Sequence, residues 1–158
     1  MSDTVATATV ALVLHSLSAV VWVGGMFFAL LALRPATAPL DPGPRLELWS
    51  RVLERFFLWV IVAIVLLLAS GYGMIFGVYG GFRGVGLHIN LMQGVGIIMM
   101  LLFFHLYFAP WRRFQAAVRH QDYPAAARQL NQIRVIVAIN LVLGLITVAV
   151  GSSGRYWG

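Results

Sequence analysis

The chain has 158 residues, of which 61% are hydrophobic and only 10% are charged, and its formal net charge is +6. Soluble domains carry about 25% charged residues, so this composition excludes a water-soluble fold and indicates a membrane protein. The chain has no cysteine, which excludes disulfides, thiolate metal sites and cysteine nucleophiles. A bound metal would need histidine, methionine or oxygen ligands.

Four apolar runs are long enough to cross the hydrocarbon core of a bilayer, which takes about 20 helical residues. They cover residues 8–33, 56–78, 85–108 and 135–152. The sequence therefore predicts an all-α protein with a single membrane domain over residues 1–158, folded as a four-helix transmembrane bundle.

The segments between these runs have signals of their own. Residues 34–44 contain four prolines and predict a turn-rich connector. Leu46, Trp49, Leu53 and Phe56 follow at helical spacing and predict an interfacial helix that runs into the second span. After the third span we expect a basic loop, with Asp122 capping the helix that leads into span four.

Aromatic and glycine residues near the span ends have ordinary roles in membrane proteins. Trp111, Tyr156 and Trp157 lie where interfacial aromatic anchors are expected. Gly73 and Gly77 have the spacing of a helix-packing motif, which is also common by chance in glycine-rich spans.

The arginines predict the topology. All eleven basic residues are arginine; nine flank the loops between spans one and two and between spans three and four, whereas Arg83 and Arg155 lie on the opposite side. Basic loops stay cytoplasmic, so both termini should face outward, as in a multi-pass protein of a bacterial-type inner membrane. This topology explains the basic charge, so we expect the lipid bilayer as partner and no nucleic acid.

Two histidines are the most informative residues. No Asp, Glu, Lys or Arg falls inside the four spans, so the ionisable chemistry there belongs to His15 and His88. At 1.5 Å rise per residue they lie roughly 10 Å and roughly 5 Å below the same surface, and can share one layer. His105 lies near the opposite surface, and His120 falls in the basic loop.

The helical faces around the two histidines suggest a pocket. The His15 face continues through Trp22 and Gly25, and the His88 face continues through Met92 and Met99. Small residues beside a histidine leave room for a flat macrocycle between helices, but they also serve plain helix packing. Each histidine alone could simply hydrogen-bond to a carbonyl or serine of a neighbouring span, whereas two at matching depth favour a shared metal-ligand role for His15 and His88.

The sequence also resembles a family. His15 followed by Trp22-Val23-Gly24-Gly25-Met26-Phe27, and the segment Leu87-His88-Ile89-Asn90-Leu91, resemble the related CopD-type copper-resistance membrane proteins and HemJ-type protoporphyrinogen oxidases. The HemJ side of the resemblance implies a haem b held by His15 and His88 and oxidation of protoporphyrinogen. Asn90 stands where the HemJ pattern has a lysine, and its amide cannot supply that positive charge. The CopD side implies copper passage along His88, Met92 and Met99, joined by Met26.

Three hypotheses follow. The first is a haem b protein, an oxidoreductase acting in electron transfer or on a porphyrinogen- or quinol-like membrane-soluble substrate. In it Trp22, Gly25, Asn90 and Met92 lie beside the cofactor, and Arg83 or Arg155 meets its propionates. The alternative is a copper transport or copper-resistance membrane protein. The third is a structural or assembly subunit whose histidines only form hydrogen bonds. As further partners we expect a membrane-soluble substrate or redox partner, and a homo-oligomer is also compatible with the sequence.

Overall fold

The computed structural model describes residues 2–156, without the side chains of residues 2–4, 84 and 155. Helices make up the fold, and the described residues contain no strand. In chain order the elements are α1 (Ser2–Phe28), η1 (Ala29–Leu33), α2 (Arg34–Ala36), α3 (Pro42–Gly77), η2 (Phe82–Gly84), α4 (Leu87–Leu106), η3 (Tyr107–Trp111), α5 (Arg112–Arg119), α6 (Tyr123–Ser153) and η4 (Gly154–Tyr156). The predicted all-α class is confirmed.

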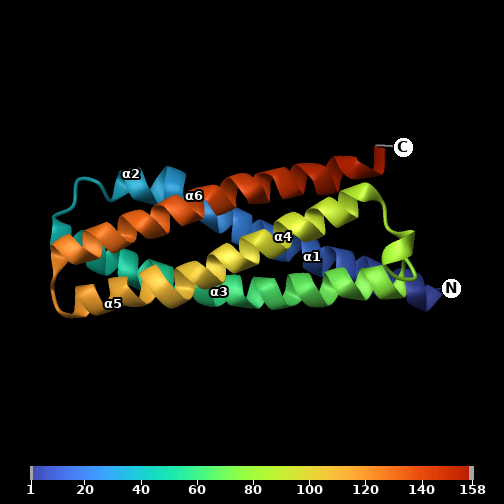
Figure 1. Cartoon of the computed structure of the whole chain (residues 1–158), viewed down its shortest axis with the longest axis horizontal. Helices are drawn as coiled ribbons and strands as arrows, with labels where there is room; N and C mark the ends of the chain where they lie inside the picture. Colours follow the sequence, from blue (N-terminus) through green and yellow to red (C-terminus); the bar gives the residue numbers. More distant parts are fainter. Residues whose placement is uncertain (1, 157–158) are drawn as a thin grey trace.

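These elements form four long rods that lie along the long axis of the molecule (Figure 1). Four helical stretches in the described residues are long and apolar enough to cross a membrane: Val5–Ala36, Pro42–Gly77, Leu87–Arg119 and Tyr123–Ser153. Their outer faces carry exposed apolar side chains such as Leu58, Trp59 and Leu101, as a lipid environment requires. The four predicted spans are confirmed.

Both ends of the chain lie at the same end of the bundle, which we call the termini end (Figure 1). The opposite end holds the α2–α3 and α5–α6 connections and is called the arginine-rich end. The arginine bias still predicts that the arginine-rich end faces the cytoplasm.

Two prolines correct the predicted helix limits. The connector was expected over residues 34–44, but α2 carries the first rod past Pro35, and the irregular connector covers only residues 37–41. A π-helical turn, η1, precedes Pro35, and another, η3, contains Pro110. A π-turn accommodates the missing proline N–H and the bulk of the ring, so both rods continue where a regular α-helix would break.

The basic loop after span three is also largely helical. Arg112, Arg113 and Arg119 lie on α5, which continues the third rod, so the connection to α6 is reduced to His120–Asp122. The predicted cap is confirmed, because the Asp122 side chain accepts a hydrogen bond of 3.0 Å from the backbone N–H of Ala125.

An aromatic cluster forms the core of the arginine-rich half. The Phe57 ring of α3 packs edge-on against Phe103 of α4 at 5.6 Å and against Trp111 at 5.1 Å. Trp22 of α1 packs edge-on against Phe103 at 6.2 Å. Trp111 is only 4% exposed, so the prediction that it is an interfacial anchor was wrong: the continuation of the third rod turns it into the core.

The helical spacing of Leu46, Trp49 and Leu53 also marks a buried face rather than an interfacial one. All three side chains are buried in the same core, while Phe56 is partly buried beside it. Helix α3 runs from Pro42 through this stretch without a break, which confirms that it joins the second span. Tyr156 is exposed at the termini end, and Trp157 lies outside the described residues.

We expect Gly25→Ala to lower the free energy of unfolding by about 1–3 kcal/mol, the usual cost of overpacking. A methyl group at Gly25 of α1 would overlap the Phe56 ring of α3. The matched control is Gly24→Ala, whose added methyl meets open space, so this variant should be neutral or stabilised by up to about 1 kcal/mol. Equal losses in both variants, measured by denaturation in detergent, would contradict this account of the contact.

Candidate functional site

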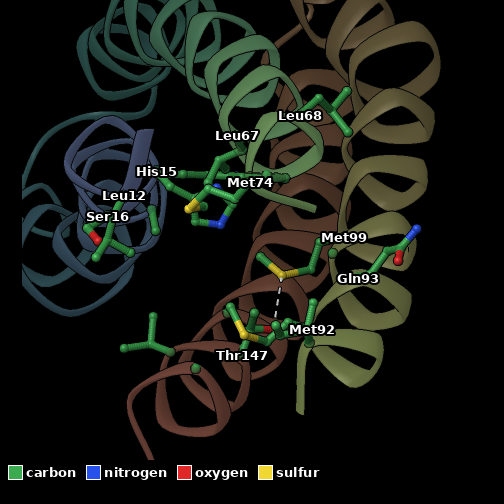
Figure 2. Close-up of a pocket in the computed structure, with 18 of the residues that line it drawn as sticks. Leu12, His15, Ser16, Leu67, Leu68, Met74, Met92, Gln93, Met99 and Thr147 are labelled. Atoms are coloured by element: carbon green, nitrogen blue, oxygen red, sulfur yellow. Dashed lines mark hydrogen bonds between the residues drawn. The ribbon is translucent and has the colours of Figure 1, made fainter. Parts of the chain in front are cut away.

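A cavity of 490 Å³ lies between the four rods in the half of the bundle nearer the termini end. Its wall includes His15 and Trp22 from α1, and His88, Met92 and Met99 from α4. Helix α3 contributes Met74, and α6 contributes two glycines and Thr147. Most of the predicted site residues therefore line one space, shown from within the bundle in Figure 2.

His15 is held by a hydrogen bond to α3. Its Nδ1 lies 3.0 Å from the Ser70 hydroxyl oxygen, and the Ser70 hydroxyl donates to the carbonyl of Leu66. Because the serine proton is used there, the serine oxygen accepts from Nδ1–H, which leaves the lone pair of Nε2 free. Nδ1 of His15 therefore forms the hydrogen bond to a serine of a neighbouring span that was one of the expected alternatives. Nε2 of the same ring remains available for a ligand.

Glycine at position 71 makes room for the His15 ring. A side-chain carbon at this position would come within 3.2 Å of the His15 Cε1 atom. The imidazole projects from α1 into the space between the helices, as does the Met74 thioether from α3 (Figure 2). Nε2 of His15 is therefore the nitrogen available to an occupant of the cavity.

His88 lies at the termini end of the same cavity. It is the second residue of α4, and its side chain packs on Gly154, where an added methyl group would overlap it. Gly144 of α6 faces both Val23 of α1 and Met99 of α4, so these two residues lie at one depth. Counting back along the two parallel helices places His15 about three residues deeper than His88, or roughly 4.5 Å.

Two glycines of α6, and Gly154 at the start of η4, face a row of side chains on α4. Met99 lies against Gly144, Met92 against Gly151 and His88 against Gly154. The hydroxyl of Thr147 also lies 4.0 Å from the Met99 sulfur (dashed line in Figure 2). The absence of side chains on α6 at these places lets one imidazole and two thioethers stand in a row between the helices.

Several residues of the site were missed by the sequence reasoning. Ser70, which orients His15, and Met74, which adds a thioether, lie in an otherwise ordinary apolar span, and Met100 of α4 also lines the cavity. Asn140, 2% exposed, donates 3.1 Å from its amide to the carbonyl of Met99, and its own Oδ1 is buried with no partner. Gln93 of α4 donates 3.2 Å to the Tyr72 hydroxyl of α3 and ties the cavity wall together.

Other predicted residues lie off the cavity. Gly25 does not line it but packs on Phe56, and Asn90 is exposed on the outer side of α4. Met26 is buried in the core below the cavity and is not part of its wall. Arg83 is exposed in η2, and the side chain of Arg155 lies outside the described part of the chain.

Neither remaining histidine belongs to this site. His105 is exposed on α4, nearer the arginine-rich end, and His120 is exposed at the end of α5. Gly73 and Gly77 are exposed as well, and a methyl group at either would meet open space, so they make no close helix contact within the described residues.

The electrostatic character of the cavity is neutral. Among the described side chains, its wall holds no carboxylate, lysine or arginine. Over residues 2–156 no cluster of three or more His, Asp or Glu side chains suited to a metal ion occurs. The polar atoms that face the space are imidazole nitrogens, thioether sulfurs, hydroxyls and one amide, so it suits an occupant that prefers soft, uncharged ligands.

The fold and the cavity together define a multi-pass membrane protein whose four helices enclose a neutral imidazole and thioether site. The family model for copper resistance protein D, CopD, matches residues 50–153, which is more than half of the chain. The chain belongs to the CopD family. The matched segment includes His88, Met92 and Met99, while His15 precedes it. No curated protein and no solved structure matches the chain.

We expect His15 to be the Nδ1–H tautomer, because Ser70 can only accept from that nitrogen. Two-bond ¹H–¹⁵N correlation spectra of histidine-labelled protein should show a protonated Nδ1 and an unprotonated Nε2 at neutral pH. In Ser70→Ala this preference should disappear, while the exposed His120 should give the same signals in both proteins. A dominant Nε2–H tautomer in the unaltered protein would contradict the assigned hydrogen bond.

Proposed function

We propose that this protein binds monovalent copper in the cavity and passes it through the membrane. The observation that carries the proposal is the ligand set: His15, His88 and the thioethers of Met74, Met92 and Met99 line one space. Thioethers are soft ligands that select Cu(I), and imidazole nitrogens also bind copper well. Membership of the copper resistance protein D family supports the same cargo.

The arrangement of the ligands suggests how the ion moves. His88 lies nearest the termini end, Met92 follows one turn deeper, and Met99 lies about two turns below Met92. His15 and Met74 face this row from the other two helices (Figure 2). Cu(I) enters beside His88 and exchanges one neutral ligand for the next along the row.

Asn140 extends the polar row beyond the floor of the cavity. Its amide is bonded to the backbone of Met99, and its unpartnered Oδ1 is the next buried polar atom toward the arginine-rich end on this helix pair. A buried acceptor without a donor is costly, so an ion or a water beside it is favoured. In the proposal this oxygen meets the ion as it leaves Met99.

Haem b, the first of the three hypotheses from the sequence, would occupy the same space. His15 and His88 both line the cavity and would hold the iron, which would supply one-electron chemistry. The fit is incomplete, however, because among the described side chains, which do not include that of Arg155, no cation lines the cavity to meet the propionates. The four thioethers on the wall, those of Met74, Met92, Met99 and Met100, would also have no role. We therefore derive no step through haem.

The first test is copper binding by purified protein with reducing agent present. We expect about one Cu(I) per chain, with affinity lowered about 10-fold or more in His15→Ala, in His88→Ala and in the double variant Met92→Leu/Met99→Leu. The matched control is Met26→Leu, which removes a buried thioether away from the cavity wall and should bind as the unaltered protein does. Competition with a colorimetric Cu(I) chelator measures all five proteins.

The outcome also separates copper from haem. A Soret band that is lost in both histidine variants but kept in the double methionine variant, with no bound Cu(I), would overturn the copper proposal in favour of haem b. Histidine variants that change only the folding yield and bind copper normally would leave the histidines a structural role.

Ser70→Ala tests the orientation of His15. Outer hydrogen bonds to ligating histidines typically contribute 10- to 100-fold to metal affinity, so we expect a loss of about 10-fold in Cu(I) affinity. The thermal midpoint in detergent should change little, because one interhelical hydrogen bond contributes about 0.6 kcal/mol in membrane proteins. A full loss of binding accompanied by unfolding would show that Ser70 supports the fold rather than the ligand.

A further inference from the structure

Three arginines from three separate segments gather at the arginine-rich end. They are Arg34 of α2, Arg45 in the first turn of α3 and Arg134 of α6. Trp49 brings their segments together: it lies one helical turn after Arg45, carries the Arg134 guanidinium on its ring, and donates a hydrogen bond to Thr37, three residues after Arg34. Like charges repel, so such a group is unfavourable unless something neutralises it. Membrane topology requires arginines at this end but does not require these three to converge.

The described residues offer these arginines no anionic partner. The ion pair found at this end joins Arg51 to Glu47 at 3.2 Å, and no carboxylate among the described side chains lies within ion-pair distance of Arg34, Arg45 or Arg134. Moreover, the Nε atom of Arg134 is buried without a hydrogen-bond acceptor. A buried guanidinium donor without an acceptor is costly, so Arg134 gains from an anion that bonds to its terminal nitrogens, which are not among the buried atoms.

The position of Arg134 is fixed by its neighbours. Its guanidinium carbon lies 4.8 Å from the centre of the Trp49 ring, and the Trp49 indole N–H donates 3.0 Å to the buried Thr37 hydroxyl. Stacking on an indole leaves the edge of the guanidinium open while holding its plane. Arg134 is thus presented in an ordered orientation.

We propose that Arg34, Arg45 and Arg134 form a binding site for a phosphate group. A guanidinium fork matches the oxygens of a phosphate, and three of them around one anion remove their mutual repulsion. The phosphate comes from the headgroup of an anionic phospholipid or from free phosphate, and the experiment separates these two sources. The site lies at the opposite end of the bundle from His15 and His88 and is independent of the copper proposal.

The experiment compares lipid binding by the unaltered protein and two charge-matched variants. Arg34→Gln/Arg45→Gln removes two of the three arginines but keeps the Arg134–Trp49 stack. The control, Arg119→Gln/Arg128→Gln, removes two exposed arginines from the same end. Native mass spectrometry and thermal melting in nanodiscs measure binding of phosphatidylglycerol against phosphatidylcholine, and the same proteins in detergent are titrated with inorganic phosphate.

We expect the unaltered protein and the control to prefer phosphatidylglycerol, and the site variant to bind it about five-fold more weakly for each arginine removed. Arg134→Lys, which keeps the charge but not the fork, should fall between them. If inorganic phosphate protects the unaltered protein and the control as well as the lipid does, free phosphate is the occupant. If the control loses as much as the site variant, or if neither phosphate source binds, the proposal is overturned.

Discussion

The aromatic packing around Phe57 is the constraint on which the rest of the molecule depends. This one ring of α3 touches Phe103 of α4 and Trp111 of η3, and Phe103 in turn holds Trp22 of α1. Aromatic contacts of this kind add stability beyond the apolar area they bury, and they join three of the four rods at the arginine-rich half. The opposite half can therefore stay open around a cavity without loss of the bundle.

The fourth rod meets the others through glycine. In lipid, helices gain little from apolar burial and associate mainly by close packing and by hydrogen bonds between them. Gly144 and Gly151 on α6 allow Met99 and Met92 to approach the α6 backbone, and the Asn140 amide adds a hydrogen bond to the Met99 carbonyl. The contacts that hold α6 in place are thus the same contacts that present the thioethers to the cavity.

Hydropathy predicted the four spans, because a bilayer demands long apolar helices whatever their neighbours are. The first and third spans end later than expected because the π-turns η1 and η3 accommodate Pro35 and Pro110. The rule that proline breaks an α-helix does not predict such a turn. His15, His88, Met92 and Trp22 line one space, because they lie on the faces of α1 and α4 that point into the bundle. Their role in binding a metal or cofactor stays a prediction.

Gly25 and Asn90 were expected beside the cofactor but do not line the cavity. The pattern of residues along one face of a helix does not show which neighbouring helix that face contacts. Ser70 and Met74 lie on a helix that the motifs did not cover, and their residue types are common in any span. The seven-residue spacing of Gly144 and Gly151 was the one sequence signal that could have indicated where α6 approaches α4.

The neutrality of the cavity bears on which ion it can hold. The cost of moving an ion from water into a medium of low dielectric constant grows with the square of its charge, and no carboxylate on the wall offsets that cost. A divalent ion would therefore pay about four times the desolvation penalty of a monovalent one, with the same uncharged ligands to compensate for it. Imidazole and thioether groups bind monovalent copper strongly enough to compensate for a single charge, whereas alkali ions gain little from sulfur. Under the copper proposal, the same argument accounts for the lack of an acidic residue on the described cavity wall: a carboxylate would hold the ion in place, and a site that passes an ion onward must also release it.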